Sequence, residues 1–199
     1  MALTQQRSAT QPASGAWTYD DLLALPDDGR RWEIIEGVLY EMSGASWIHQ
    51  MLVAGLLRFW FGIADSVGAT VVGSPVDVFF PGASPVQPDI LLLLPSNPAT
   101  VSKRGLEGAP DLVVEILSPS TRGHDALTKR ALYARAGVRE YWLVHPDART
   151  VEVLRLVDDA FHLAQRAGER DTAASLLLPG AALDVAALFA RFETGPRPE

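Results

Sequence analysis

Residues 110–117 read PDLVVEIL, and this stretch decides the fold. Residues 112–117 are almost wholly apolar and rich in Val, Ile and Leu, which is typical of a central strand buried on both faces of a sheet. Glu115 lies inside that run. Burying a lone carboxylate there is costly unless the carboxylate is paired or binds a metal. Glu115 therefore predicts either a buried ion pair with Arg or Lys, or part of a functional site.

A second acid opens another apolar run. Asp89 follows Pro88 and precedes Ile90–Leu94. Proline suits the entry of a strand, and an aspartate there could simply cap a turn. If the two runs form neighbouring strands, Asp89 and Glu115 come together. With a lysine nearby, the two carboxylates could hold Mg²⁺ or Mn²⁺ and a water beside a phosphate.

The composition excludes several classes of protein. The chain has 199 residues, enough for one domain with a sizeable core, and 48% of them are hydrophobic. It contains no cysteine, which excludes disulfides, thiolate metal sites and a cysteine nucleophile. The net charge of −7 opposes indiscriminate binding to nucleic acid. Positions 101–140, around the suspected site, nevertheless hold seven basic and five acidic residues.

The order of the expected elements indicates an α/β (α+β) fold, with a mixed sheet flanked by helices and an N-terminal hairpin. Helices are expected over residues 19–25, 47–67, 123–136 and 183–192. Strands are expected over residues 31–36, 38–42, 70–72, 76–80, 90–94, 112–117, 140–144, 150–156 and 161–166. Residues 95–108 are expected to form a mobile flap. A single domain is expected over 17–192, between a disordered tail at 1–16 and a tail at 193–199.

The helix expected over 47–67 is apolar on nearly every side. Such a helix is predicted to be buried between layers or in a subunit interface, so we expect a homodimer. Its apolar stretch from Met51 to Ala64 is interrupted by Arg58 and is too short for a membrane span. The first residues carry no secretory signal. We therefore expect a cytoplasmic protein that does not bind a membrane.

Lys129 lies on the helix expected over 123–136, fourteen residues after Glu115. Asp125, Lys129 and Tyr133 recur at every fourth position and share one helix face. Asp125 precedes Lys129, which is the favourable order for an ion pair within a helix. Lys129 is thus a candidate catalytic group, and a structural contact with Asp125 remains the alternative.

Several segments resemble the Uma family of restriction-endonuclease-like proteins, which belongs to the PD-(D/E)XK nuclease superfamily. They are Pro88-Asp89, residues 110–121 (PDLVVEILSPST), Lys129 with Tyr133, and residues 137–144 (GVREYWLV). The segment from Trp32 to Gly37 and His49 are also similar. The resemblance covers residues 17–192 and is most specific between Glu115 and Trp142.

The resemblance implies a restriction-endonuclease-like core with its site at a fork between strands. It implies that Asp89 and Glu115 bind Mg²⁺ or Mn²⁺. Lys129 would orient the attacking water and stabilise the charge that develops on the phosphate. The superfamily usually places this lysine two residues after the second acid, where this chain has Leu117. Tyr133 would brace Lys129 from one turn further along the helix.

The resemblance leaves three further questions about individual residues undecided. Glu33 and Glu36 alternate onto opposite faces of their strand, so at most one joins the site, and we favour Glu33. His49 is either a residue packed near a helix cap or a metal ligand, although four widely spaced histidines do not make a zinc site. His145-Pro146 stands where the family usually has Asp-Pro, which we expect to change a turn and leave the site intact.

The expected function is that of a metal-dependent endonuclease that hydrolyses phosphodiester bonds of DNA. Its catalytic residues would be Asp89, Glu115, Lys129, Glu33 and Tyr133. A second hypothesis is a non-catalytic, dimeric binding module that retains the nuclease fold, which the acidic net charge and Leu117 favour. A third is a carboxylate-pair hydrolase such as a glycosidase, although no aromatic sugar platform is recognisable near the acids.

Overall fold

The computed structural model describes residues 3–5, 15–35, 37–42, 44, 46–83, 85–117 and 124–190. Its centre is a six-stranded sheet with the order β12-β11-β10-β9-β6-β4. In that order the strands are Ala160–Ala167, Thr150–Val157, Glu140–His145, Leu112–Ile116, Ile90–Leu93 and Thr70–Gly73. β9 and β10 are parallel, whereas the other neighbours are antiparallel, so the sheet is mixed as predicted.

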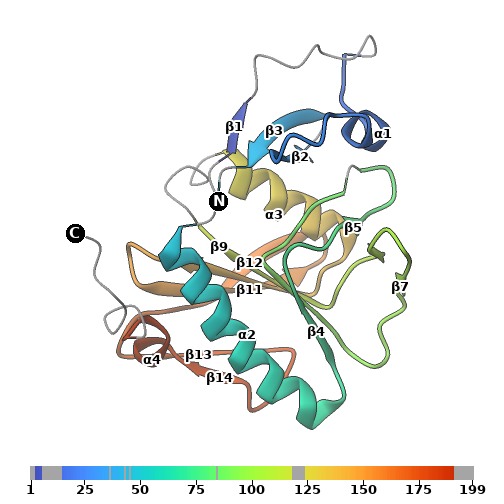
Figure 1. Cartoon of the computed structure of the whole chain (residues 1–199). Helices are drawn as coiled ribbons and strands as arrows, with labels where there is room; N and C mark the ends of the chain where they lie inside the picture. Colours follow the sequence, from blue (N-terminus) through green and yellow to red (C-terminus); the bar gives the residue numbers. More distant parts are fainter. Residues whose placement is uncertain are drawn as a thin grey trace, which may run out of the picture.

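Two helices cover opposite faces of this sheet (Figure 1). α2 (Trp47–Val67) packs on one face together with Leu112 and Val114 of β9. α3 (His124–Ala136) packs on the other face together with Val113. Successive side chains of a strand point to opposite faces, so β9 supplies apolar residues to both layers. This is why the central strands are near-continuous hydrophobic runs, and the α/β class expected from the sequence is confirmed.

A three-stranded sheet and a short helix lie beside α3 (Figure 1). β2 (Arg31–Ile35) and β3 (Val38–Met42) form the expected hairpin. Its turn contains Gly37, whose positive φ of 77° suits a glycine. α1 (Tyr19–Leu23) begins with a capping box between Thr18 and Asp21 and ends two residues before the expected position. Because β2 contacts α3, the hairpin brings Glu33 to the central sheet.

Part of the N-terminal segment is described by the structure, whereas the C-terminal tail is not. β1 (Leu3–Gln5) pairs with β3, within the segment for which a disordered tail was expected. Residues 1–2 and 6–14 of that segment, and the whole tail at 193–199, lie outside the described residues.

Two small sheets contain strands that the sequence does not mark. β5 (Val78–Phe79), β8 (Leu106–Glu107) and β7 (Thr100–Val101) form one sheet, so the expectation of a loop throughout 95–108 is wrong. β13 (Thr172–Ala174) pairs with β14 (Ala182–Asp184) in the other. α4 (Val185–Ala190) therefore begins two residues later than expected. Strands of two or three residues are too short for alternation to reveal them.

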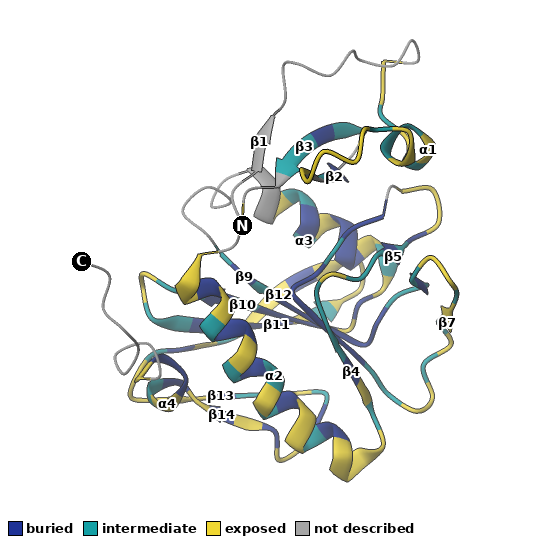
Figure 2. Ribbon diagram, in the orientation of Figure 1, coloured by how far each residue is buried: buried dark blue, intermediate teal, exposed yellow. Residues whose placement is uncertain are grey.

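α2 has the predicted bounds, but only one side of it is buried (Figure 2). The Ser46 side chain caps its first turn, and Gly68 ends it in the left-handed conformation. The face toward the sheet consists of His49, Leu52, Val53, Leu56, Trp60 and Ala64. Phe61, Trp47 and Ile48 are exposed, so α2 is not buried between layers on every side, and the alternative of a subunit interface stays a prediction. By length and composition alone α2 could cross a membrane, yet its buried face is part of the protein core.

Candidate functional site

The register between β6 and β9 places Asp89 opposite Glu115. The last paired residues are Ile90 with Val114, and Asp89 precedes Ile90 by one residue while Glu115 follows Val114. Directly opposed residues of an antiparallel pair have Cβ atoms about 4.5–5.5 Å apart. The two acids singled out from the sequence are therefore neighbours at one end of the central sheet.

Asp89 is 7% exposed and is held through one carboxylate oxygen. Its Oδ2 accepts a 2.8 Å hydrogen bond from the backbone N–H of Ile116 on β9. The same oxygen lies 3.2 Å from Nε2 of His49, in the first turn of α2. Within the described part of the chain, no hydrogen bond reaches Oδ1. Asp89 thus joins β6, β9 and α2 and keeps one oxygen for another partner.

Glu115 points toward α3, because it shares the face of β9 with Val113. Its Oε1 accepts a 2.6 Å hydrogen bond from the Tyr133 hydroxyl. Nζ of Lys129 lies 3.6 Å from the same oxygen. Lys129 and Tyr133 are one helical turn apart, so a single face of α3 presents both groups to Glu115.

Glu33 reaches the site from β2 and is 2% exposed. Its Oε1 lies 3.2 Å from Nζ of Lys129 and accepts a 3.1 Å hydrogen bond from the backbone N–H of Gln87. Its Oε2 is buried and has no hydrogen-bond partner. Glu33 is therefore the inward-facing glutamate of the hairpin, whereas Glu36 lies outside the described residues.

Lys129 is buried between two carboxylates rather than exposed on its helix. The sequence also offered Asp125 as its partner, but the Asp125 side chain lies outside the described residues. A buried ammonium is tolerated only where opposite charges compensate for its lost hydration. Glu33, together with Glu115 when Glu115 is ionised, provides that compensation, and the two side chains fix Nζ beside the acid pair.

The electrostatics of the site favour adding a cation. The pKa of Glu115 is raised to about 8, chiefly by burial and also by the negative charges of Asp89 and Glu33. Lys129 and the Tyr133 hydrogen bond act in the opposite direction and only partly offset burial. Burial, with the charge of Glu115, also holds the pKa of Tyr133 well above its usual value. Tyr133 is therefore a hydrogen-bond donor here and not a base.

The donor set fits a hard divalent cation. Oδ1 of Asp89 has no hydrogen bond within the described part of the chain, Glu115 lies opposite, and Oε2 of Glu33 is buried without a partner. The described residues contain no ready-made group of three His, Asp or Glu ligands. Mg²⁺ commonly binds one or two carboxylates and completes its shell with water and substrate phosphate. Asp89 and Glu115 are the residues that would hold it.

Three of the seven basic residues between positions 101 and 140 serve other contacts. Arg104 pairs with Glu107 and lies over the Phe79 ring. Arg139 pairs with Asp111, and Arg130 donates to the carbonyl of Phe161. Among the described cations of this segment, Lys129 is the one paired with Glu33 and Glu115. Part of the local positive charge thus serves structural contacts.

Sequence reasoning left the roles of His49 and Gln87 undetermined. His49 is the one polar residue on the buried face of α2, where the other positions are apolar, and that contrast is the signal of a special role. Gln87 holds Glu33 through its backbone N–H and Asp77 through its side chain. Every residue except proline has a backbone N–H, so the sequence could not indicate that Gln87 donates to Glu33.

Comparisons with known proteins agree with this fold. The model of the Uma2 family, described as "Putative restriction endonuclease", matches residues 19–186. A crystal structure described as a putative nuclease belonging to DUF820, from Anabaena variabilis ATCC 29413, is similar with a TM-score of 0.70 and 21% sequence identity. The alignment covers 88% of this chain and 98% of that chain, and at this identity it shows the fold alone. No curated protein matches the sequence.

Proposed function

Because the chain belongs to the Uma2 family of restriction-endonuclease-like proteins, we propose that it is a metal-dependent endonuclease that hydrolyses phosphodiester bonds of DNA. The observation that carries the proposal is the position of Lys129. Its Nζ lies 3.2 Å from Glu33 and 3.6 Å from Glu115, and Glu115 is opposite Asp89. A buried ammonium beside two acids that fit a metal supplies the groups that phosphodiester hydrolysis needs.

Each residue has a role that follows from its contacts. Asp89 and Glu115 would hold Mg²⁺ or Mn²⁺, which when bound polarises a phosphoryl oxygen. Lys129 orients the attacking water and stabilises the negative charge that grows on the phosphate. Glu33 fixes the ammonium of Lys129, and Tyr133 fixes the Glu115 carboxylate. Lys129 on α3 would thus take the role of the lysine that the superfamily usually has at the position of Leu117.

Metal binding is the first test, because it does not require the correct DNA sequence. We expect calorimetry to detect Mn²⁺ binding by the parent and its loss in Asp89→Asn and Glu115→Gln. Asp111→Asn is the matched control: Asp111 is also buried just before a strand, but its carboxylate is occupied by Leu94 N, Asn97 and Arg139. Equal Mn²⁺ binding by the parent and both site variants would overturn the metal assignment.

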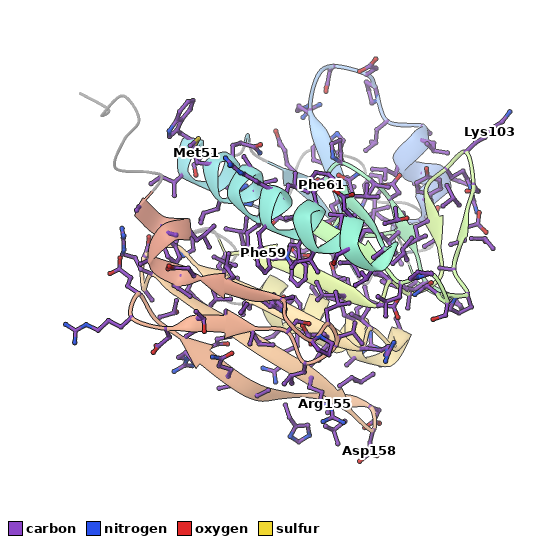
Figure 3. The ribbon with its side chains drawn as sticks, turned by 90° about the horizontal axis from the view of Figure 1, so that it is seen from below. Met51, Phe59, Phe61, Lys103, Arg155 and Asp158 are labelled. Carbon is purple, nitrogen blue, oxygen red and sulfur yellow. The ribbon has the colours of Figure 1, made fainter. Side chains whose placement is uncertain are left out.

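Cleavage of plasmid and linear DNA with Mg²⁺ or Mn²⁺ is the second test. We expect Lys129→Met to lower the rate by about 10²–10³-fold, the usual effect of removing a group that stabilises transition-state charge. Lys103→Met is the control, because Lys103 is exposed and projects from the tip between β7 and β8 (Figure 3). Cleavage that persists in a chelator would overturn the metal dependence of the proposed reaction.

The alternative of a non-catalytic, dimeric module has its own supporting observation. Trp47, Ile48 and Phe61 are exposed on α2, and exposed apolar side chains of this size are typical of interaction surfaces. A folded parent that forms a stable dimer, binds no Mn²⁺ and cuts no DNA would favour this function over the nuclease.

A further inference from the structure

His49 is the polar residue of the site with no role in the proposed reaction. Its side chain is 4% exposed and comes from α2, on the face of the sheet opposite to α3. Nε2 lies 3.2 Å from Oδ2 of Asp89. The remaining buried residues on this face of α2 are apolar and pack in the core. His49 therefore differs from its helix neighbours in contacting a candidate metal ligand.

The protonation of the ring follows from its partner. An ionised carboxylate only accepts hydrogen bonds, so Nε2 must carry the proton and donate it to Asp89. In a neutral ring Nδ1 is then a bare acceptor. Nδ1 is buried and has no hydrogen-bond partner among the residues that the structure describes. A fully satisfied histidine would not leave this nitrogen unpaired, so the ring is poorly matched to its apolar surroundings.

We propose that His49 is a positioning residue, which locks the Asp89 carboxylate through Oδ2 so that Oδ1 is the oxygen presented to the cation. Two donors, Ile116 N and His49 Nε2, converge on Oδ2. With both in place, the carboxylate cannot rotate to exchange its oxygens without breaking two hydrogen bonds. Hydrogen bonds of this kind orient metal ligands, and their loss typically lowers metal affinity by about 10- to 100-fold. This inference rests on the proposed function.

The same geometry predicts that His49 contributes little to stability. A leucine at position 49 would match the apolar face formed by Leu52, Val53 and Leu56, and it would remove the unpaired nitrogen. Asp89 would keep the Ile116 hydrogen bond. If His49 instead stabilised the fold, its replacement would lower the melting temperature. Stability and metal affinity measured together therefore separate the two roles.

The experiment measures Mn²⁺ affinity by calorimetry, and thermal unfolding without metal, on the full chain. We expect His49→Leu to weaken Mn²⁺ binding by about 10- to 100-fold while the melting temperature is unchanged or higher. His49→Gln should bind within a few-fold of the parent, because its amide N–H occupies nearly the place of Nε2. His49→Asn should lose affinity like His49→Leu, because its amide is too short to reach Asp89; it also replaces the leucine variant if that one fails to fold.

Val53→Ala is the matched control, since Val53 is buried one turn further along the same face. It should lower the melting temperature and leave Mn²⁺ affinity unchanged. Parent-like Mn²⁺ affinity in His49→Leu and His49→Asn overturns the role of His49 and leaves the proposed function standing. Loss of affinity in all three His49 variants together with a lower melting temperature also overturns it, because the ring is then structural. A parent that binds no Mn²⁺ removes both proposals.

Discussion

The Tyr133 hydroxyl donates a 2.6 Å hydrogen bond to Oε1 of Glu115, the same oxygen that lies 3.6 Å from Nζ of Lys129. One carboxylate oxygen is therefore shared by two groups from successive turns of α3. Both contacts lower the pKa of Glu115, against burial and the charges of Asp89 and Glu33, which raise it. Changes in the pKa of Glu115 can therefore be used to test the roles of the residues that contact it.

Replacing Tyr133 by phenylalanine removes the hydrogen bond and should raise the pKa of Glu115 above about 8. A metal ligand must be deprotonated, so Mn²⁺ affinity increases with pH until the pKa of the free carboxyl is passed. In Tyr133→Phe this increase should continue to higher pH than in the parent. Calorimetric titrations across pH 6–9 measure the shift. Tyr19→Phe, distant in α1, should leave the profile unchanged.

Without metal, the free energy of unfolding should decrease as pH rises, because the pKa of Glu115 is raised in the folded state. Glu115 holds its proton up to about pH 8 in the folded chain but loses it near its usual value of 4.5 when unfolded. Between these values the folded state binds more protons, so its stability falls as pH rises, by up to about 1.4 kcal/mol per pH unit. This contribution is complete below pH 4.5 and lost above pH 8.

Urea denaturation at pH 6, 7 and 8 checks this behaviour. Glu115→Gln should lack the downward trend, because an amide does not titrate in this range. Added Mn²⁺ should flatten the trend in the parent, since the metal competes with the proton. A parent and a Glu115→Gln variant with identical pH profiles would mean that Glu115 titrates normally.

Glu33→Gln distinguishes anchoring of Lys129 from direct metal binding. Glu33 is paired with Lys129 at 3.2 Å, so the variant should displace the ammonium and slow DNA cleavage by at least about tenfold. Mn²⁺ affinity should stay within a few-fold of the parent, because Asp89 and Glu115 are intact. Glu41→Gln, on the neighbouring strand β3, is the control. Loss of Mn²⁺ binding in Glu33→Gln alone would instead make Glu33 a ligand.

Glu140 is a buried acid whose contacts indicate a role in stability rather than in the candidate site. Its Oε1 accepts from the Trp142 indole N–H, and its Oε2 accepts from the backbone N–H groups of Leu176 and Leu177. Glu140→Ala removes an acceptor from three N–H groups, one of which is the buried Trp142 indole, and should destabilise the chain by about 2–4 kcal/mol. Thermal and urea unfolding measure this loss. Mn²⁺ affinity of the folded fraction should not change.

The sequence specified the local elements where periodicity and caps agree. α2 has the predicted bounds because Ser46 and Gly68 mark its ends and its apolar residues recur at helical spacing. β9 is recognisable because a strand buried on both faces has to be apolar throughout. β7 and β8, each two residues long, escaped prediction because β7 pairs with β8 and β8 pairs with β5, 28 positions earlier in the chain.

The chain's sequence by itself determined the fold class, the strand that carries Glu115 and the acids worth testing, because buried charge in an apolar run is visible in one dimension. Only the tertiary structure decided which partners those acids have. The β6–β9 register set Asp89 opposite Glu115, the hairpin placed Glu33 on Lys129, and α2 brought His49 to Asp89 from the other side of the sheet. These contacts join residues 26 to 96 positions apart in the sequence, and such pairings arise only when packing and strand register are fixed.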